Sequence, residues 1–336
     1  MNNRQIPAEY SPNTPKRTKW VKPLILAVIV IVIAILPLVI KSSYILHILI
    51  LTFVYIVASA SFRTIAISGQ FALAHAAFLG IGAYIAGMAS RWLGWPPWFT
   101  IPSGAIVAGI LGVISGYPFA RLRSLYYAMG SLFLGVAINT ATSAAGIWTG
   151  GYSGLTGVHP IFTGSRVPYY YLFLGLTLLS LIALYRFEFS RIGLNLKAIA
   201  QSHQVASSVG INEVWYRVLA LGIGCFFVGL IGAGYAHYNM VLSPTSFNLA
   251  ATLWIVMYAL IGGIESFAGP LIGTPILVII PEVFRDLKNY SPYVSAGILI
   301  IIVYFMPKGL VDLPNLILSL FRNRKKDKKA ARAAET

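Results

Sequence analysis

The side chains that most often carry out catalysis or bind metals are sparse in this sequence and do not cluster. Five histidines stand alone: His47, His75, His159, His203 and His237. Isolated histidines of this kind are more typical of packed or hydrated residues than of metal ligands, and no HExxH pattern is present. One cysteine, Cys225, falls within an apolar run, so the chain can form no internal disulfide and no cysteine metal site. The sequence therefore predicts no catalytic or metal centre.

Sites for ATP or for a coupling ion are also not evident. No G-x4-G-K-[ST] pattern occurs, so the chain has no P-loop of its own. Glu265, Glu282 and Asp286 lie at predicted span ends or breaks. A secondary transporter usually needs a buried carboxylate to bind its coupling ion. This argues against ion coupling, although Glu265 keeps that alternative open.

One glycine-rich segment is a candidate site. Trp148–Gly157 reads WTGGYSGLTG and enters a predicted outer loop. Composition alone favours a flexible cluster of turns there.

Two helix breaks are further candidates. Ser68–Gln70 and Gly262–Ser266 each interrupt an apolar region ahead of a helix rich in small residues. Gly69 precedes Gly80 by the same interval as Gly262 precedes Gly273, which hints at the internal duplication that transporters often have.

The elements that must position these segments are membrane spans. The chain has 336 residues, of which 57% are hydrophobic and 10% charged, whereas a soluble domain carries about a quarter charged residues. Continuous apolar runs exclude a soluble protein and disfavour a membrane β-barrel. About ten spans are predicted: 24–40, 44–62, 71–89, 99–120, 126–146, 169–185, 218–237, 249–263, 267–284 and 293–306. The predicted fold class is an all-α polytopic membrane protein.

Positive charge orients these spans. Residues 1–23 and 307–336 form basic tails on either side of a membrane domain, 24–306. With the N-terminus inside, 20 of the 25 lysines and arginines fall on the inner side and five on the outer side. The positive-inside rule thus predicts cytoplasmic termini, and the expected location is the cytoplasmic (inner) membrane. The net charge of +16 is then explained by anionic headgroups, with no nucleic-acid-binding module in view.

The polar segment 186–217 interrupts the apolar chain and is predicted to be cytoplasmic. Its residues form a pattern typical of a short helix or a helix pair. Gly210 is expected to provide a left-handed C-terminal cap, and Asn212 an N-cap for the next helix. A polar surface between spans predicts contact with a soluble partner.

Five motifs, taken in order, resemble the branched-chain amino acid permeases of ATP-binding-cassette (ABC) importers, in particular the M-type subunit. They are ALAHAAFLGIGAY (72–84), TGGYSGLTGV (149–158), RIGLNLKAIAQSHQVASSVGIN (191–212), GGIESFAGPLIG (262–273) and FMPKGL (305–310).

This resemblance implies a permease with a cytoplasmic coupling helix and no enzymatic activity of its own. The implied partners are a second permease, two ATPase subunits that hold ATP and Mg²⁺, and an extracytoplasmic substrate-binding protein, all at a lipid membrane and without nucleic acid. The resemblance implies that the coupling residues are Arg191, Gly193, Ala206, Gly210 and Asn212, with Gly193 and Gly210 as hinges of a helix 194–210. The expected translocation path includes Gly69, Gln70, His75, Thr149, Gly150, Gly151 and Gly154.

The implied substrate is a branched-chain or related neutral amino acid. Urea or a short amide would suit the same neutral path. An ion-coupled secondary transporter is the alternative mechanism. A membrane scaffold or enzyme is disfavoured because no catalytic side chains cluster.

Overall fold

The computed structural model describes residues 21–40, 42–122, 124–284 and 309–312, together with Gly297, Ile300 and Tyr304. The chain divides into two units, Met1–Lys41 and Ser42–Thr336. Within the described part of the first unit is one apolar helix, α1 (Val21–Val39). The predicted span 293–306 and the two basic tails lie largely outside the described residues.

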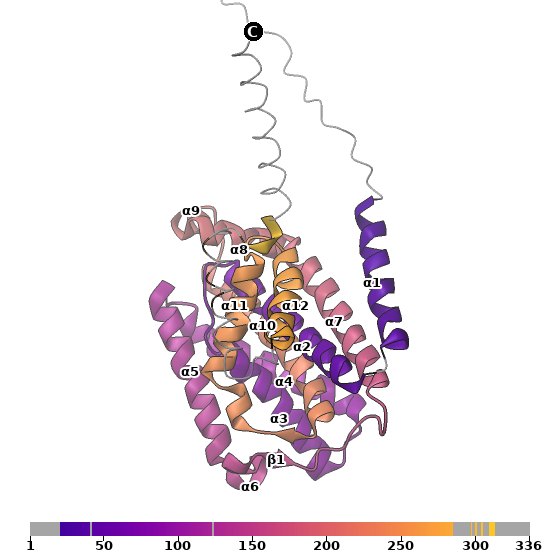
Figure 1. Ribbon diagram of the computed structural model, residues 1–336. Helices are drawn as coiled ribbons and strands as arrows, with labels where there is room; N and C mark the ends of the chain where they lie inside the picture. The colour runs from indigo at the N-terminus through magenta and orange to yellow at the C-terminus, as the bar shows by residue number, and fades with distance from the viewer. Residues whose placement is uncertain are drawn as a thin grey trace, which may run out of the picture. The chain divides into compact units, whose positions relative to one another are not determined.

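The second unit is a bundle of apolar helices (Figure 1). Six of its described helices are long and apolar enough to cross a membrane: α2 (Ser43–Ala66), α3 (His75–Leu93), α4 (Pro97–Phe119), α7 (Val167–Glu188), α10 (Glu213–Asn239), and α11 (Leu249–Gly262) taken together with the 3-10 turn η2 (Pro244–Phe247). A seventh is obtained if α5 (Ser124–Ala144) forms one span with the segment Gly146–Ser153, which begins with α6 (Gly146–Thr149) and is bent by 84° against α5. Two other predicted spans fall on α1 and α12 (Ala268–Val283), whose apolar parts are shorter. A polytopic helical membrane protein is confirmed, with six or seven candidate spans in the described part where about ten were expected.

Small residues bring α3, α4 and α10 into backbone contact. A Cβ at Gly82 of α3 would overlap the backbone of Gly229 in α10, and a Cβ at Gly104 of α4 would lie 2.6 Å from the Gly82 carbonyl oxygen. Close backbone approach of this kind replaces the hydrophobic driving force that is missing between helices in lipid. These three helices therefore form the tightly packed centre of the bundle.

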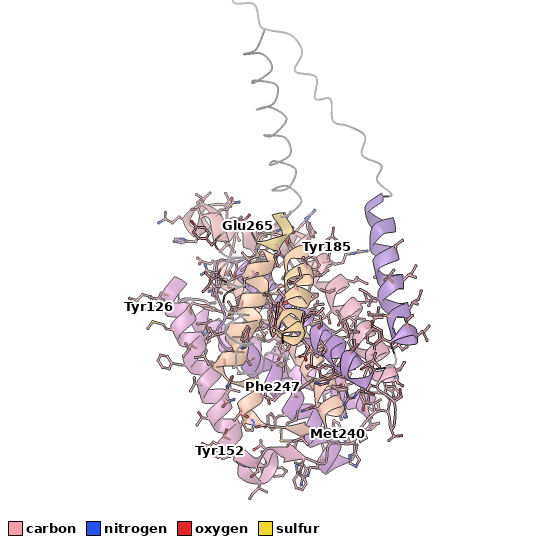
Figure 2. The ribbon with its side chains drawn as sticks, viewed as in Figure 1. Tyr126, Tyr152, Tyr185, Met240, Phe247 and Glu265 are labelled. Carbon is pink, nitrogen blue, oxygen red and sulfur yellow. The ribbon has the colours of Figure 1, made fainter. Side chains whose placement is uncertain are left out.

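The two ends of the bundle carry different connections. The short helices α8 (Arg191–Gln201) and α9 (His203–Ser208) lie at one end, called here the α8 end. The opposite β1 end holds α6, η1 (Gly151–Ser153) and an antiparallel pair of strands, β1 (Leu155–Thr156) and β2 (Val241–Leu242), in which Leu155 pairs with Leu242. Figure 2 shows Glu265 at the α8 end, Tyr152 at the β1 end and Phe247 between them.

Helices α3 and α11 begin inside the bundle. Helix α2 ends at Ala66, Gly69 follows with φ +80, and α3 starts only at His75. The backbone N–H of Ala76 donates to the Thr252 hydroxyl of α11 at 3.1 Å, so the first turns of the two helices meet. Gly263, with φ +111, separates α11 from α12. Both predicted helix breaks are therefore confirmed.

Candidate functional site

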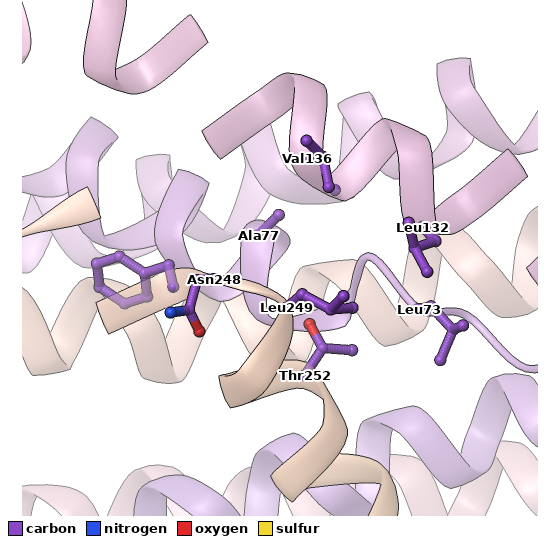
Figure 3. Close-up of a pocket in the computed structure, with 9 residues that line it drawn as sticks. Leu73, Ala77, Leu132, Val136, Asn248, Leu249 and Thr252 are labelled. Carbon is purple, nitrogen blue, oxygen red and sulfur yellow. The ribbon is translucent and has the colours of Figure 1, made fainter. Parts of the chain in front are cut away.

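A small hollow lies where the first turns of α3 and α11 meet (Figure 3). Its lining comprises Leu73, Ala77, Leu132, Gly135, Val136, Phe247, Asn248, Leu249 and Thr252. Asn248 caps α11 by accepting from the Ala251 N–H at 3.0 Å. Thr252 and Asn248 lie on one wall, and Leu132 and Val136 of α5 form the other. The lining is mostly apolar, with Asn248 and Thr252 as its polar side chains.

A second hollow continues from the first along α5. It is lined by Ala77, Gly80, Tyr84, Ile138, Asn139, Thr142, Pro244 and Phe247. Because Ala77 and Phe247 line both hollows, the hollows adjoin at these residues, and the Phe247 ring borders the second hollow at Gly80. The ring is 4% exposed, packs edge-on against Tyr84 and leaves no free space for a side chain at Gly80.

The predicted path residues Thr149, Gly150, Gly151 and Gly154 lie at the β1 end of this route. The Thr149 hydroxyl donates to the carbonyl oxygen of Thr142, a residue of the second hollow, at 2.7 Å. The three glycines have φ of +76, +57 and +83, values that favour glycine. A Cβ at Gly154 would overlap the Leu242 carbonyl. The segment is therefore an ordered turn whose backbone requires glycine at positions 150 and 154.

The predicted path residues Gly69, Gln70 and His75 lie on the α8 side of the first hollow. The Ser61 hydroxyl donates to the Ala58 carbonyl at 2.9 Å, so its oxygen accepts from Nε2 of His75 at 2.8 Å. Nδ1 of His75 and Nε2 of Gln70 are buried without a hydrogen-bond partner among the described residues.

The structure thus places the two predicted groups on opposite sides of the hollows and does not bring them together. The residues between them were missed: Asn139, Phe247, Asn248 and Thr252. Asn248 could have been found from the sequence, because an asparagine directly before an apolar run is typical of a helix N-cap.

The predicted coupling residues cluster around α8 and α9. Arg191 is the exposed first residue of α8, and Ala206 is buried in α9. Gly193 meets the end of α7, since a Cβ there would overlap the Glu188 carbonyl. Gly210 has φ +83, and the Asn212 side chain accepts from the Trp215 N–H at 3.1 Å, so both predicted caps are confirmed.

The helix predicted over 194–210 is divided in two. Ser202 has an extended backbone with φ −160, and its hydroxyl accepts from the Val205 N–H at 3.4 Å. It ends α8 and caps α9, because a serine side chain competes well with the helix for backbone N–H groups.

A buried ion pair at the α8 end was also missed. Arg63 of α2 pairs with Glu188 of α7, and both side chains are 2% exposed. The Lys197 ammonium of α8 binds the same carboxylate at 2.9 Å. The sequence showed these residues only as separate loop charges, because the partners lie 125 positions apart.

No reactive centre accompanies these features in the described part of the chain. No group of three histidine, cysteine, aspartate or glutamate side chains there could hold a metal ion.

Comparison with known proteins gives a consistent result. The family described as "Branched-chain amino acid transport system / permease component" matches residues 44–307. The high-affinity branched-chain amino acid transport system permease protein LivM of Salmonella typhimurium is 24% identical over 309 residues, which cover 83% of this chain and 73% of that protein. LivM of Escherichia coli K12 gives the same values. LivH of Escherichia coli K12 is 29% identical over 143 residues, which cover 42% of this chain and 46% of LivH. No solved structure matches the chain.

Proposed function

The chain belongs to the branched-chain amino acid transport permease family, and we propose that it is a membrane subunit of an ABC importer for branched-chain or related neutral amino acids. The observation that carries this proposal is the contact of α8 with the route through the bundle. Ala200 of α8 lies against Gly69, the residue that leads into the segment before the first hollow. Movement of a helix outside the membrane therefore has a direct path to the candidate site.

The lining of the first hollow suits a zwitterion with an apolar side chain. The first turns of α3 and α11 carry partial positive charge that favours a carboxylate. Leu73, Leu132, Val136 and Leu249 offer apolar contacts for the side chain. Because Val136 is 46% exposed, the hollow reaches the outer surface of α5, where a second permease subunit would complete it.

The α8 end is assigned to the cytoplasm. Of the eight lysines and arginines within residues 42–122 and 124–284, six lie at that end: Arg63, Arg121, Arg186, Arg191, Lys197 and Arg217. Arg91 and Arg166 lie at the β1 end, where they donate to the carbonyl oxygens of Thr156 and Ser43. This asymmetry supports an inner location for α8 and α9.

In this mechanism, ATPase subunits dock on Arg191 and the neighbouring exposed surface of α8 and α9, while the buried Ala206 holds α9 in place. Their ATP-driven closure moves this helix pair, with Gly193 and Gly210 at its ends. The bundle then opens the hollows alternately to either side of the membrane. A substrate-binding protein would deliver the amino acid at the β1 end, next to the glycine turn 150–154.

Cysteine labelling tests this orientation. Gln201 in α8 and Tyr152 in η1 are both exposed, and the native Cys225 is buried. In intact cells, a membrane-impermeant maleimide is expected to label Tyr152→Cys, and to label Gln201→Cys only after permeabilisation. Labelling of Gln201→Cys from outside would overturn the assignment.

An ATPase subunit should also co-purify with the chain.

A further inference from the structure

The guanidinium of Arg63 joins separate segments of the α8 end. Arg63 is 1% exposed in the last turn of α2. Besides its ion pair with Glu188, its Nε donates to the Ile264 carbonyl at 2.7 Å and its Nη2 to the Glu265 carbonyl at 3.0 Å. Since Lys197 of α8 binds the same Glu188 carboxylate, a continuous polar chain runs from α8 to the turn between α11 and α12.

That turn belongs to a tightly packed helical hairpin. A Cβ at Gly273 of α12 would lie 2.5 Å from the Gly262 Cα of α11, and a Cβ at Gly269 would overlap the Gly263 carbonyl. Gly309 packs equally closely, because a Cβ there would lie 2.5 Å from the Gly263 Cα. Helices α11 and α12 therefore pack backbone to backbone and are expected to move as one body.

Helix α11 carries such a movement to the first hollow. It has 14 residues and is thus about 21 Å long. Its last residue, Gly262, adjoins the turn, and its first residue, Leu249, lines the hollow with Thr252. A shift or tilt imposed at the turn would therefore displace one wall of the hollow.

An arginine at position 63 is better suited to joining separate segments of the chain than to filling space in the core. A buried ion pair is weak evidence of stabilisation, because well-packed apolar residues often do as well. Guanidinium presents several donors in a fixed plane, which lets one side chain bind Glu188 and two carbonyl groups at once. A lysine could hold the carboxylate but lacks this fork.

We propose that Arg63 is a positioning residue that ties α8 to the α11–α12 hairpin, so that displacement of α8 moves the α11 wall of the hollow. This inference rests on the proposed function for the source of the force, the ATPase subunits. The tie itself is a property of this chain and can be measured without partners.

The test uses the purified full chain in lipid nanodiscs, with spin labels at Gln201→Cys and Glu265→Cys. Both side chains are exposed, and the native Cys225 is buried. Electron paramagnetic resonance should give one narrow distance distribution in the parent protein and a broader one with Arg63→Lys. Arg121→Lys is the matched control, since Arg121 is an exposed arginine at the same end whose hydrogen bond among the described residues is to Tyr117, four positions earlier. It should leave the distribution narrow.

A distribution with Arg63→Lys as narrow as in the parent, at equal helical content, would overturn the tie. If Arg63→Lys does not fold, Lys197→Met removes only the α8 arm of the polar chain and should broaden the distribution as well. A narrow distribution with Lys197→Met would then contradict the proposal.

A leucine uptake assay separates this inference from the proposed function. In cells that contain the whole importer, Arg63→Lys is expected to lower uptake about tenfold while ATP hydrolysis continues. If the parent chain supports no uptake but the label distances respond as expected, the proposed function fails and the tie stands. Normal uptake with Arg63→Lys overturns the tie and leaves the function intact.

Discussion

Ala200 of α8 neighbours Gly69 of the α2–α3 connection: the Cα and Cβ of Ala200 are each 3.7 Å from the position that a Cβ at Gly69 would occupy. Helix α8 therefore rests directly on the segment that leads to His75 and the first hollow. Together with the Arg63 guanidinium, this contact gives the helices at the α8 end two links to the interior of the bundle.

Gly69→Ala is expected to lower both thermal stability and uptake. Space is sufficient for the new methyl group, but φ of +80 costs an L-residue about 1–2 kcal/mol. Thermal unfolding of the purified chain measures this cost. Gly175→Ala in α7 is the control, because nothing lies within 4 Å and a helical alanine is favoured over glycine by about 1 kcal/mol. Equal melting temperatures for the two variants would contradict the prediction.

Gly210→Pro is expected to uncouple ATP hydrolysis from uptake without preventing membrane insertion. Proline cannot adopt φ of +83, and it removes the Gly210 N–H that donates to the Ser207 carbonyl at 3.0 Å. The substitution therefore displaces α9 from α10. Gly164→Pro makes an equally incompatible change, at φ +96, in the connection before α7. ATPase activity and uptake are compared in both variants. Normal coupling of ATP hydrolysis to uptake in Gly210→Pro would contradict a role of α9 in coupling.

Phe247→Ala is expected to let substrate leak through the importer. Phe247 lines both hollows, so loss of its ring is expected to widen the space where they adjoin. The measurement is efflux of radiolabelled leucine from preloaded proteoliposomes without ATP. Phe99→Ala, which removes a ring that is 68% exposed, should leave efflux at the parent level. Tight vesicles with Phe247→Ala would show that the two hollows are not one route.

Glu265→Gln is expected to change uptake by less than about twofold, as surface substitutions usually do. The side chain is exposed, and Arg63 binds the Glu265 backbone carbonyl, which the substitution retains. The measurement is the initial rate of leucine uptake by the variant and by the parent. An ion-coupled transporter would instead lose uptake, because this carboxylate was the candidate for binding its ion.

Local features of the fold could be predicted well from the sequence. Apolar runs predicted the spans, and glycines predicted the helix breaks. Gly69 and Gly263, which both have positive φ, lie at these breaks in the structure. Gly210 and Asn212 were correctly predicted as caps, because a cap depends only on residues a few positions away.

Features that depend on distant contacts could not be predicted. Arg63 was counted as a loop cation, and nothing near it in the chain indicates Glu188 or the carbonyl groups of 264 and 265 as partners. The hollows were missed for the same reason, since α3, α5 and α11 supply their walls. The resemblance put Thr149 and His75 on one path, but the two hollows that adjoin at Ala77 and Phe247 are visible only in the packed bundle.

The most direct measurement is leucine accumulation by proteoliposomes that contain this chain with its permease, ATPase and binding-protein partners. We predict accumulation when ATP is supplied on the side of α8 and α9, and none from a proton or sodium gradient alone. Gradient-driven leucine accumulation by this chain without ATP would contradict the account.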